Sequence, residues 1–179
     1  SHTSTALARL DENGAASYTF DLEWAPTAPI EVPETAQIIE AGSISAIIEP
    51  GASAVLDALA RGRKHALVFF DPNARPSIMG EPAVALVSLE RFIALADVVK
   101  VSDEDIEWLT GGVPIDKVVD RWLGMGPSLV VVTRGKHGSD VATASGVRFT
   151  KTPSDVKVVD TVGAGDSFMG GMIDAMWGM

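Results

Sequence analysis

The chain has 179 residues, 46% of them hydrophobic, so it can bury a sizeable core and is expected to fold as a globular domain. Its formal net charge of -10 argues against nucleic acid and anionic membrane surfaces as partners, because both attract clustered Lys and Arg. The absence of cysteine excludes disulfides, thiolate zinc sites and cysteine nucleophiles. No apolar run is long enough to span a bilayer and no signal peptide is visible, so we expect a cytoplasmic location.

The first predicted element is a β-hairpin. Residues 6–10 and 17–22 are rich in strand-forming side chains, and Asn13-Gly14 between them favours a tight hairpin turn. Residues 24–34 contain three prolines and are expected to form a loop.

Strands and helices alternate over the rest of the chain. We predict strands over 37–40, 66–70, 97–101 and 129–132, a hairpin over 141–143 and 147–150, and helices over 52–60, 82–96, 102–109, 114–123 and 165–177. Runs such as Ala-Leu-Val-Phe-Phe at 66–70 are typical of strands buried on both faces. The alternation predicts an α/β fold with a mainly parallel sheet flanked by helices, which binds ligands beyond the carboxyl ends of its strands.

The strongest chemical signal is Asp-Thr-Val-Gly-Ala-Gly-Asp-Ser-Phe at 160–168. Here a loop of small residues leads into the last predicted helix, whose first N–H groups lack partners within the helix and favour an anion. Gly163, Ala164 and Gly165 allow a ligand to approach the backbone. Asp166 falls in the first helical turn, where it can accept a proton from an attacking hydroxyl. A glycine-rich turn with a favourable first-turn charge explains the spacing alone equally well.

This segment resembles the C-terminal signature of the ribokinase-like, or PfkB, carbohydrate kinases. The resemblance implies that Gly163, Ala164 and Gly165 form the anion hole for the transferred phosphoryl group. It also implies that Asp166 is the catalytic base that activates the sugar hydroxyl.

A second segment, Phe-Asp-Pro-Asn-Ala-Arg-Pro at 70–76, resembles the Asp-Pro-Asn-x-Arg segment of fructokinase-like family members. The resemblance implies that Asn73 and Arg75 bind the substrate and that Arg75 assists catalysis. A planar guanidinium suits phosphate because it can bind two oxygens at once. The alternative is a surface arginine that follows a turn.

A third segment, at 131–138, resembles the Thr-x-Gly-x-x-Gly nucleotide loop of the family through Thr133, Gly135 and Gly138. It is not a Walker A loop, because Val130 and His137 occupy positions where that loop requires Gly and Ser or Thr. A plain β-turn between strands is the alternative.

The family's Asn-x-x-Glu motif, which organises Mg²⁺ and phosphates, aligns with Ser102 and Asp105. The resemblance implies that Ser102 contacts the nucleotide and that Asp105 acts indirectly on Mg²⁺, although both residues depart from the motif. Ser-x-x-Asp is also an ordinary helix capping box, and both roles are compatible. By the same resemblance, Asp160 and the Val162 carbonyl bind a monovalent cation such as K⁺.

The resemblance further implies a ribokinase-like fold with a small β lid. Residues 1–30 would form part of the lid and its connection, with Phe20 lining the sugar, and residues 31–179 a partial α/β kinase core. The chain does not begin with Met, and it lacks the family's N-terminal Gly-Gly signature and the elements that complete the adenine pocket. We therefore expect it to be incomplete at both ends and inactive by itself.

The expected activity is the transfer of a phosphoryl group from ATP, with Mg²⁺, to a sugar hydroxyl. Fructose is the favoured substrate, while ribose, 2-keto-3-deoxygluconate and nucleosides remain open. A non-catalytic sugar- or nucleotide-binding relative is an alternative from another class. A dinucleotide-dependent oxidoreductase is disfavoured, because its glycine loop should follow the first strand of a βαβ unit. Family lids often pair between subunits, so a homodimer is expected.

Overall fold

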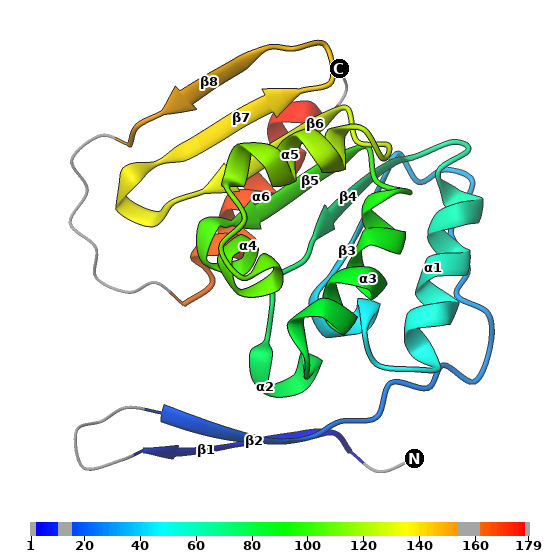
Figure 1. Cartoon of the computed structure of the whole chain (residues 1–179). Coiled ribbons are helices and arrows are strands. Elements are labelled where there is room, and N and C mark those ends of the chain that lie inside the picture. The colour runs from blue at the N-terminus through cyan, green and yellow to red at the C-terminus, as the bar shows by residue number, and fades with distance from the viewer. Residues whose placement is uncertain (1–2, 11–15, 154–161, 178–179) are drawn as a thin grey trace.

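A six-stranded sheet forms the centre of the computed structural model, which describes residues 3–10, 16–153 and 162–177 (Figure 1). Its strands, in sheet order, are β3 (Ile38–Gly42), β4 (Leu67–Asp71), β5 (Val98–Ser102), β6 (Leu129–Thr133), β7 (Ser139–Thr143) and β8 (Arg148–Lys151). The first four run parallel, and β7 and β8 add antiparallel. This confirms the predicted, mainly parallel α/β sheet.

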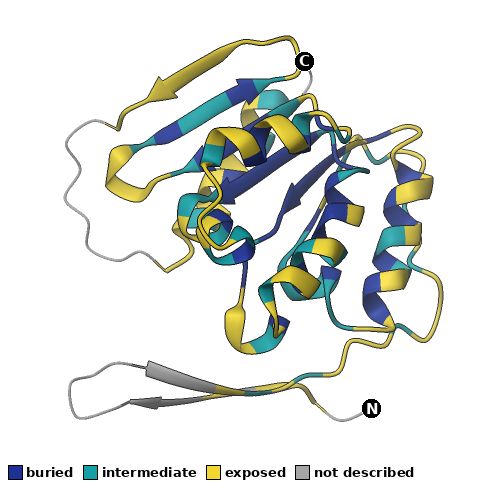
Figure 2. Cartoon of the chain, viewed as in Figure 1, coloured by how far each residue is buried: buried dark blue, intermediate teal, exposed yellow. Residues whose placement is uncertain are grey.

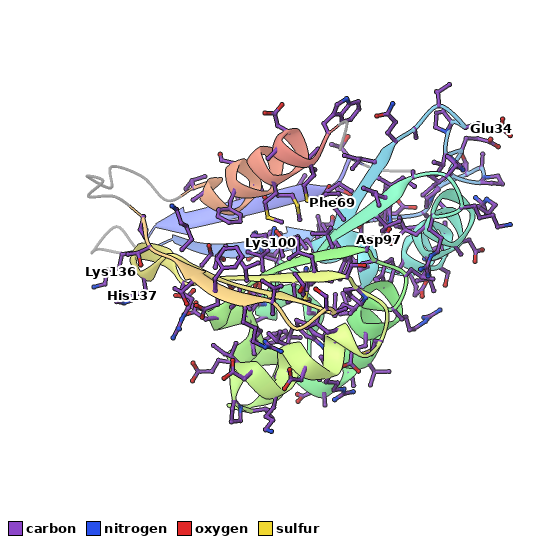
Figure 3. The ribbon with its side chains drawn as sticks, turned by 90° about the horizontal axis from the view of Figure 1, so that it is seen from above. Glu34, Phe69, Asp97, Lys100, Lys136 and His137 are labelled. Atoms are coloured by element: carbon purple, nitrogen blue, oxygen red, sulfur yellow. The ribbon has the colours of Figure 1, made fainter. Side chains whose placement is uncertain are left out.

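Helices cover the two faces of the sheet unequally. They are α1 (Gly51–Gly62), α2 (Pro76–Met79), α3 (Pro82–Ile93), α4 (Asp103–Thr110), α5 (Ile115–Leu123) and α6 (Ala164–Met176), with short 3-10 helices at Ser43–Ala46 and Gly135–His137. Seen from above, α6 lies over one face, and the earlier helices lie over the other (Figure 3). No helix in the described part of the chain is both long and apolar enough to cross a membrane.

Side chains that alternate along the central strands form two hydrophobic clusters, one on each face of the sheet. Phe69 and Val98 point to one side, where they pack with Met169 of α6. Their neighbours Phe70 and Val99 point to the other side and join the larger core under α1, α3, α4 and α5. The central strands are therefore buried on both faces (Figure 2), as their unbroken apolar runs predicted.

The predicted N-terminal hairpin forms a separate two-stranded sheet of β1 (Thr5–Leu10) and β2 (Ala16–Asp21). The strands pair antiparallel from Thr5–Asp21 to Leu10–Ala16. Figure 1 shows this hairpin apart from the α/β body, on the side of α2. The predicted turn at Asn13-Gly14 lies outside the described residues.

Some details differ from the sequence-based predictions. The short helix α2 was not predicted, and the helix expected over 82–96 ends at Ile93, because Ala94 to Ala96 turn into β5. Pro114 precedes α5 in an extended conformation, with ψ of 132°, rather than lying in its first turn. On α6, Phe168 is 37% exposed, whereas Met169 is buried against the sheet.

Candidate functional site

The start of α6 has the geometry of an anion site. Gly163 precedes the helix with φ of 72°, a left-handed conformation that side chains other than glycine rarely adopt. The helix then begins at Ala164, and the N–H of Ser167 donates to the Gly163 carbonyl at 2.8 Å. Ala164, Gly165 and Asp166 therefore occupy the first turn, whose N–H groups have no acceptor within the helix.

Two cavities meet at this turn. One, of about 740 Å³, is lined by Ala164 and Gly165 together with the loop that follows β6. The other, of about 620 Å³, runs along the outer edge of β3 and is lined by Asp166. Consecutive residues of one helical turn thus border both cavities, and a group held at the turn is accessible from either side.

The 740 Å³ cavity contains the predicted nucleotide loop. Thr133 ends β6, and both Gly135 and Gly138 have positive φ, 51° and 94°. A side chain at Gly138 would meet the Lys151 carbonyl at 2.0 Å, so glycine is required there for close packing. Nothing lies within 4 Å of a Cβ built on Gly135, which leaves its backbone open to the cavity. These residues fit a nucleotide whose phosphates lie at the start of α6.

The 620 Å³ cavity is bordered by the loop after β4. Asn73 has φ of 38°, and its N–H donates to Asp71 Oδ1 at 3.1 Å. The hydroxyl of Ser43, just after β3, donates to the Asn73 carbonyl at 3.1 Å. Asn73 therefore lines this cavity together with Asp166, and its role in substrate binding stays a prediction.

Arg75 makes its hydrogen bonds within the loop after β4. Its Nη1 donates to Asn73 Oδ1 at 2.7 Å and to the Ala74 carbonyl at 2.9 Å. Arg75 lines neither of the two cavities. In this structure its guanidinium stabilises the loop through these hydrogen bonds. Its role in catalysis stays a prediction.

Ser102 and Asp105 connect β5 to the loop after β4. Ser102 Oγ accepts the N–H of Asp105 at 3.0 Å and caps α4, as the capping interpretation predicted. Asp105 Oδ1 accepts the Ala74 N–H at 3.2 Å. Among the described residues, no three His, Cys, Asp or Glu side chains could together hold a metal ion. This donor set fits Mg²⁺ bound mainly by phosphate oxygens and water, with Asp105 at most at its periphery.

Three further predicted site residues lie away from the cavities or outside the described residues. Phe20 is half-buried on β2 and lines neither cavity. Val162 is 89% exposed just before α6, while Asp160 lies outside the described residues. The lid contact of Phe20 and the monovalent-cation site stay predictions.

Sequence reasoning missed a buried ion pair beneath the site. Lys100 Nζ lies 2.7 Å from Asp71 Oδ2, and the side chains are only 5% and 6% exposed. Burial raises the pKa of Asp71, whereas the hydrogen bond and charge of Lys100 act in the opposite direction. The ammonium would lie 2.9 Å from a Cβ built on Gly165, so it packs directly against the first turn of α6. A lysine inside the apolar run Val-Val-Lys-Val was the available signal.

Glu40, on β3, is the other residue missed. It lines the 620 Å³ cavity with Asp71 and Asp166. Partial burial raises the pKa of Glu40, the charges of Asp71 and Asp166 raise it further, and Lys100 opposes them. An acidic residue in the otherwise apolar segment at 38–42 was the signal for it.

Comparison with known proteins agrees with this arrangement. The profile of the pfkB family carbohydrate kinases matches residues 1–176. The chain is 34% identical over 171 residues to a fructokinase of Rhizobium leguminosarum bv. trifolii, covering 92% of this chain and 52% of that protein. It is 35% identical over 181 residues to a fructokinase of Klebsiella pneumoniae, covering 96% of this chain and 58% of that protein. The chain thus spans little more than half the length of these relatives.

Solved structures show the same likeness. The apo crystal structure of fructokinase from Vibrio cholerae O395 matches with a TM-score of 0.78 and 34% identity, covering 96% of this chain and 60% of that one. The form of that enzyme with fructose, ADP and calcium ion bound matches with a TM-score of 0.77 and 33% identity, over 96% and 57% of the two chains. With its sheet, its glycine turn and a family profile that matches nearly every residue, the chain belongs to the pfkB family of carbohydrate kinases.

Proposed function

We propose that the protein transfers a phosphoryl group from ATP to a hydroxyl of a sugar, with fructose as the substrate. The observation that carries this proposal is that consecutive residues of one helical turn border two different cavities. Ala164 and Gly165 border the cavity with the glycine loop, whereas Asp166 borders the cavity on the other side. Fructose is preferred because fructokinases recur among the relatives at 29% to 38% identity.

In this proposal the residues of the chain bind, orient and move one proton. The N–H groups at the start of α6 and the positive end of its dipole stabilise negative charge on the transferred group. Asp166 is exposed to the sugar cavity and accepts the proton of the attacking hydroxyl through its carboxylate. Asn73 orients the sugar from the loop after β4.

The cofactor assignment follows the same geometry. Thr133, Gly135 and Gly138 would hold the nucleotide, and Ser102 lies at the end of the neighbouring strand, opposite Thr133. Mg²⁺ supplies charge neutralisation between phosphate oxygens when it is bound. A monovalent cation near Val162 and Asp160 belongs to the same proposal, as does the cytoplasmic location expected from the sequence.

A kinase assay on the full-length protein tests the proposal. Purified protein with ATP and Mg²⁺ is offered fructose, ribose and 2-keto-3-deoxygluconate separately, and ADP release is measured. Fructose should give the highest kcat/KM. Asp166→Asn should lower kcat by about 10²- to 10⁴-fold, the range for loss of a general base, while circular dichroism shows a retained fold. Turnover by Asp166→Asn at the wild-type rate would refute the assignment.

We further propose a homodimer that pairs through the β1–β2 hairpin. The hairpin forms a two-stranded sheet of its own, and strand edges are surfaces on which chains pair. Sedimentation equilibrium should report twice the monomer mass, and Thr19→Pro on β2 should shift the protein toward monomer. A wild-type protein that sediments as a monomer at all concentrations would contradict this.

A further inference from the structure

Among the described residues, the charged side chains that line the 620 Å³ cavity beside Asp166 are all acidic. Glu40, Asp71 and Asp166 are the charged residues among those described that line it, and none of its described lining residues is Lys, Arg or His. Met169 and Ile173 of α6 contribute apolar surface. The described wall of this cavity is therefore acidic and apolar, with no cation to receive an anionic ligand.

The three carboxylates are not equivalent. Asp71 is neutralised from behind by Lys100 at 2.7 Å, and it also accepts the N–H of Asn73. Glu40 makes no hydrogen bond or ion pair through its carboxylate with any residue in the described part of the chain, and the residue is exposed. Glu40 and Asp166 are thus the two carboxylates that face this cavity without a cationic partner among those residues.

The strand register explains why Glu40 faces the cavity. It stands opposite Phe69 in the β3–β4 pair, and Gly42 stands opposite Asp71. Phe69 packs toward α6 together with Ile38, and alternation along β3 places Glu40 on that same face. Burial raises the pKa of Glu40, the charges of Asp71 and Asp166 raise it further and Lys100 opposes them, so the carboxylates lie within electrostatic reach of one another.

We propose that Glu40 makes this cavity select an uncharged acceptor sugar and reject sugar acids and sugar phosphates. The inference rests on the proposed sugar-kinase function and narrows its substrate class. A neutral sugar can donate hydroxyl hydrogen bonds to the Glu40 carboxylate. An anionic acceptor instead brings another negative charge beside Glu40 and Asp166, and the repulsion is stronger in a partly enclosed cavity than in water. Of the candidate sugars, fructose and ribose are uncharged and are accepted, whereas 2-keto-3-deoxygluconate carries a carboxylate and is rejected.

The experiment compares wild type and Glu40→Gln in the full-length protein. For each, kcat/KM is measured with fructose and with 2-keto-3-deoxygluconate, at low and at high ionic strength. Glu40→Gln keeps a polar side chain of the same size and removes the charge. The ratio of the sugar acid to fructose should rise by roughly tenfold in the variant at low salt. In wild type the same ratio should rise with added salt, because screening weakens the repulsion, and in the variant it should respond less.

Asp57→Asn is the matched control, because it removes one charge from an exposed position on α1 that does not line this cavity. It should leave the ratio unchanged. An unchanged ratio in Glu40→Gln, or an equal loss on both sugars, would overturn the inference, since a structural role lowers both together.

Equilibrium binding separates this inference from the proposed function. Calorimetric titration of each sugar in the absence of ATP should show weaker binding of the acid to wild type and a smaller difference for Glu40→Gln. A protein that discriminates in this way but transfers no phosphoryl group would refute the kinase proposal and leave the role of Glu40 intact. A wild-type protein that binds the acid as tightly as fructose would refute the role of Glu40.

Discussion

Lys100 and Asp71 form an ion pair of 2.7 Å on neighbouring strands, β5 and β4, and both residues are only 4% exposed. The pair lies between the sheet and the first turn of α6, where the Lys100 ammonium takes the space of a Gly165 side chain. Burying two charges is costly unless each compensates the other. This ion pair therefore links the ends of β4 and β5 to the start of α6, where the phosphoryl site is proposed.

Removal of one partner should destabilise the fold strongly. Lys100→Met leaves Asp71 as an unpaired buried carboxylate, and we expect a loss of about 3–5 kcal/mol in the free energy of unfolding. Urea denaturation of the full-length protein measures it. Arg148→Met is the control, because the partner of Arg148, Asp120, is exposed and such pairs contribute about 0–1 kcal/mol. Similar losses of unfolding free energy in both variants would show that the buried Lys100–Asp71 pair matters no more to stability than an exposed ion pair.

Two glycines of α6 should respond oppositely to alanine. Nothing lies within 4 Å of a Cβ placed on Gly171, so Gly171→Ala should stabilise the helix by about 0.5–1 kcal/mol. A Cβ at Gly165 would meet Lys100 Nζ at 2.9 Å, so Gly165→Ala should displace the ammonium from Asp71. We expect Gly165→Ala to be less stable than Gly171→Ala by about 1–3 kcal/mol. Thermal unfolding measures the stability of both variants, and equal melting temperatures would contradict the close packing of Lys100 against Gly165.

Ser102 offers a way to separate a cap from a nucleotide contact. Ser102→Ala removes the acceptor for the Asp105 N–H and should cost about 1 kcal/mol of stability. Ser102→Asn retains a good cap and should restore stability. The KM for ATP then reports on the hydroxyl itself. If it rises in both variants, Ser102 contacts the nucleotide; if it is normal in the Asn variant, the residue acts through the cap alone.

The pH dependence of stability should report on Glu40. Its pKa in the folded protein is raised above the ordinary 4.5, so the folded state favours the protonated form. Stability contributed by that proton is present below pH 4.5 and is lost as pH rises through the folded pKa. Relative to wild type, Glu40→Gln should therefore gain stability at neutral pH, and the gain should shrink as pH falls toward 4.5. Urea unfolding from pH 4 to pH 8 checks this, and a constant difference would contradict it.

Local patterns predicted most of the elements because they act over neighbouring residues. The apolar runs at β4 and β6 identified strands buried on both faces, and α4 ends at Thr110, one residue beyond the predicted end, where Gly111 has φ of 66°. The short helix α2 was missed, since one turn within a proline-rich loop carries no periodic pattern. The role of Arg75 in phosphate binding stays a prediction, and its hydrogen bonds to Asn73 and Ala74 could not be predicted because they depend on a loop conformation that residue types do not specify.

By itself, the sequence determined the order of strands and helices, the glycine turn before α6 and the candidate base Asp166, since periodicity, turn chemistry and helix-end electrostatics are encoded in contiguous residues. Only the tertiary structure decided that Lys100 lies beneath Gly165 and that Glu40 shares a cavity with Asp166. Those contacts join residues 65 and 126 positions apart along the chain. They arise from strand register and from the packing of α6 on the sheet, which no short stretch of sequence contains.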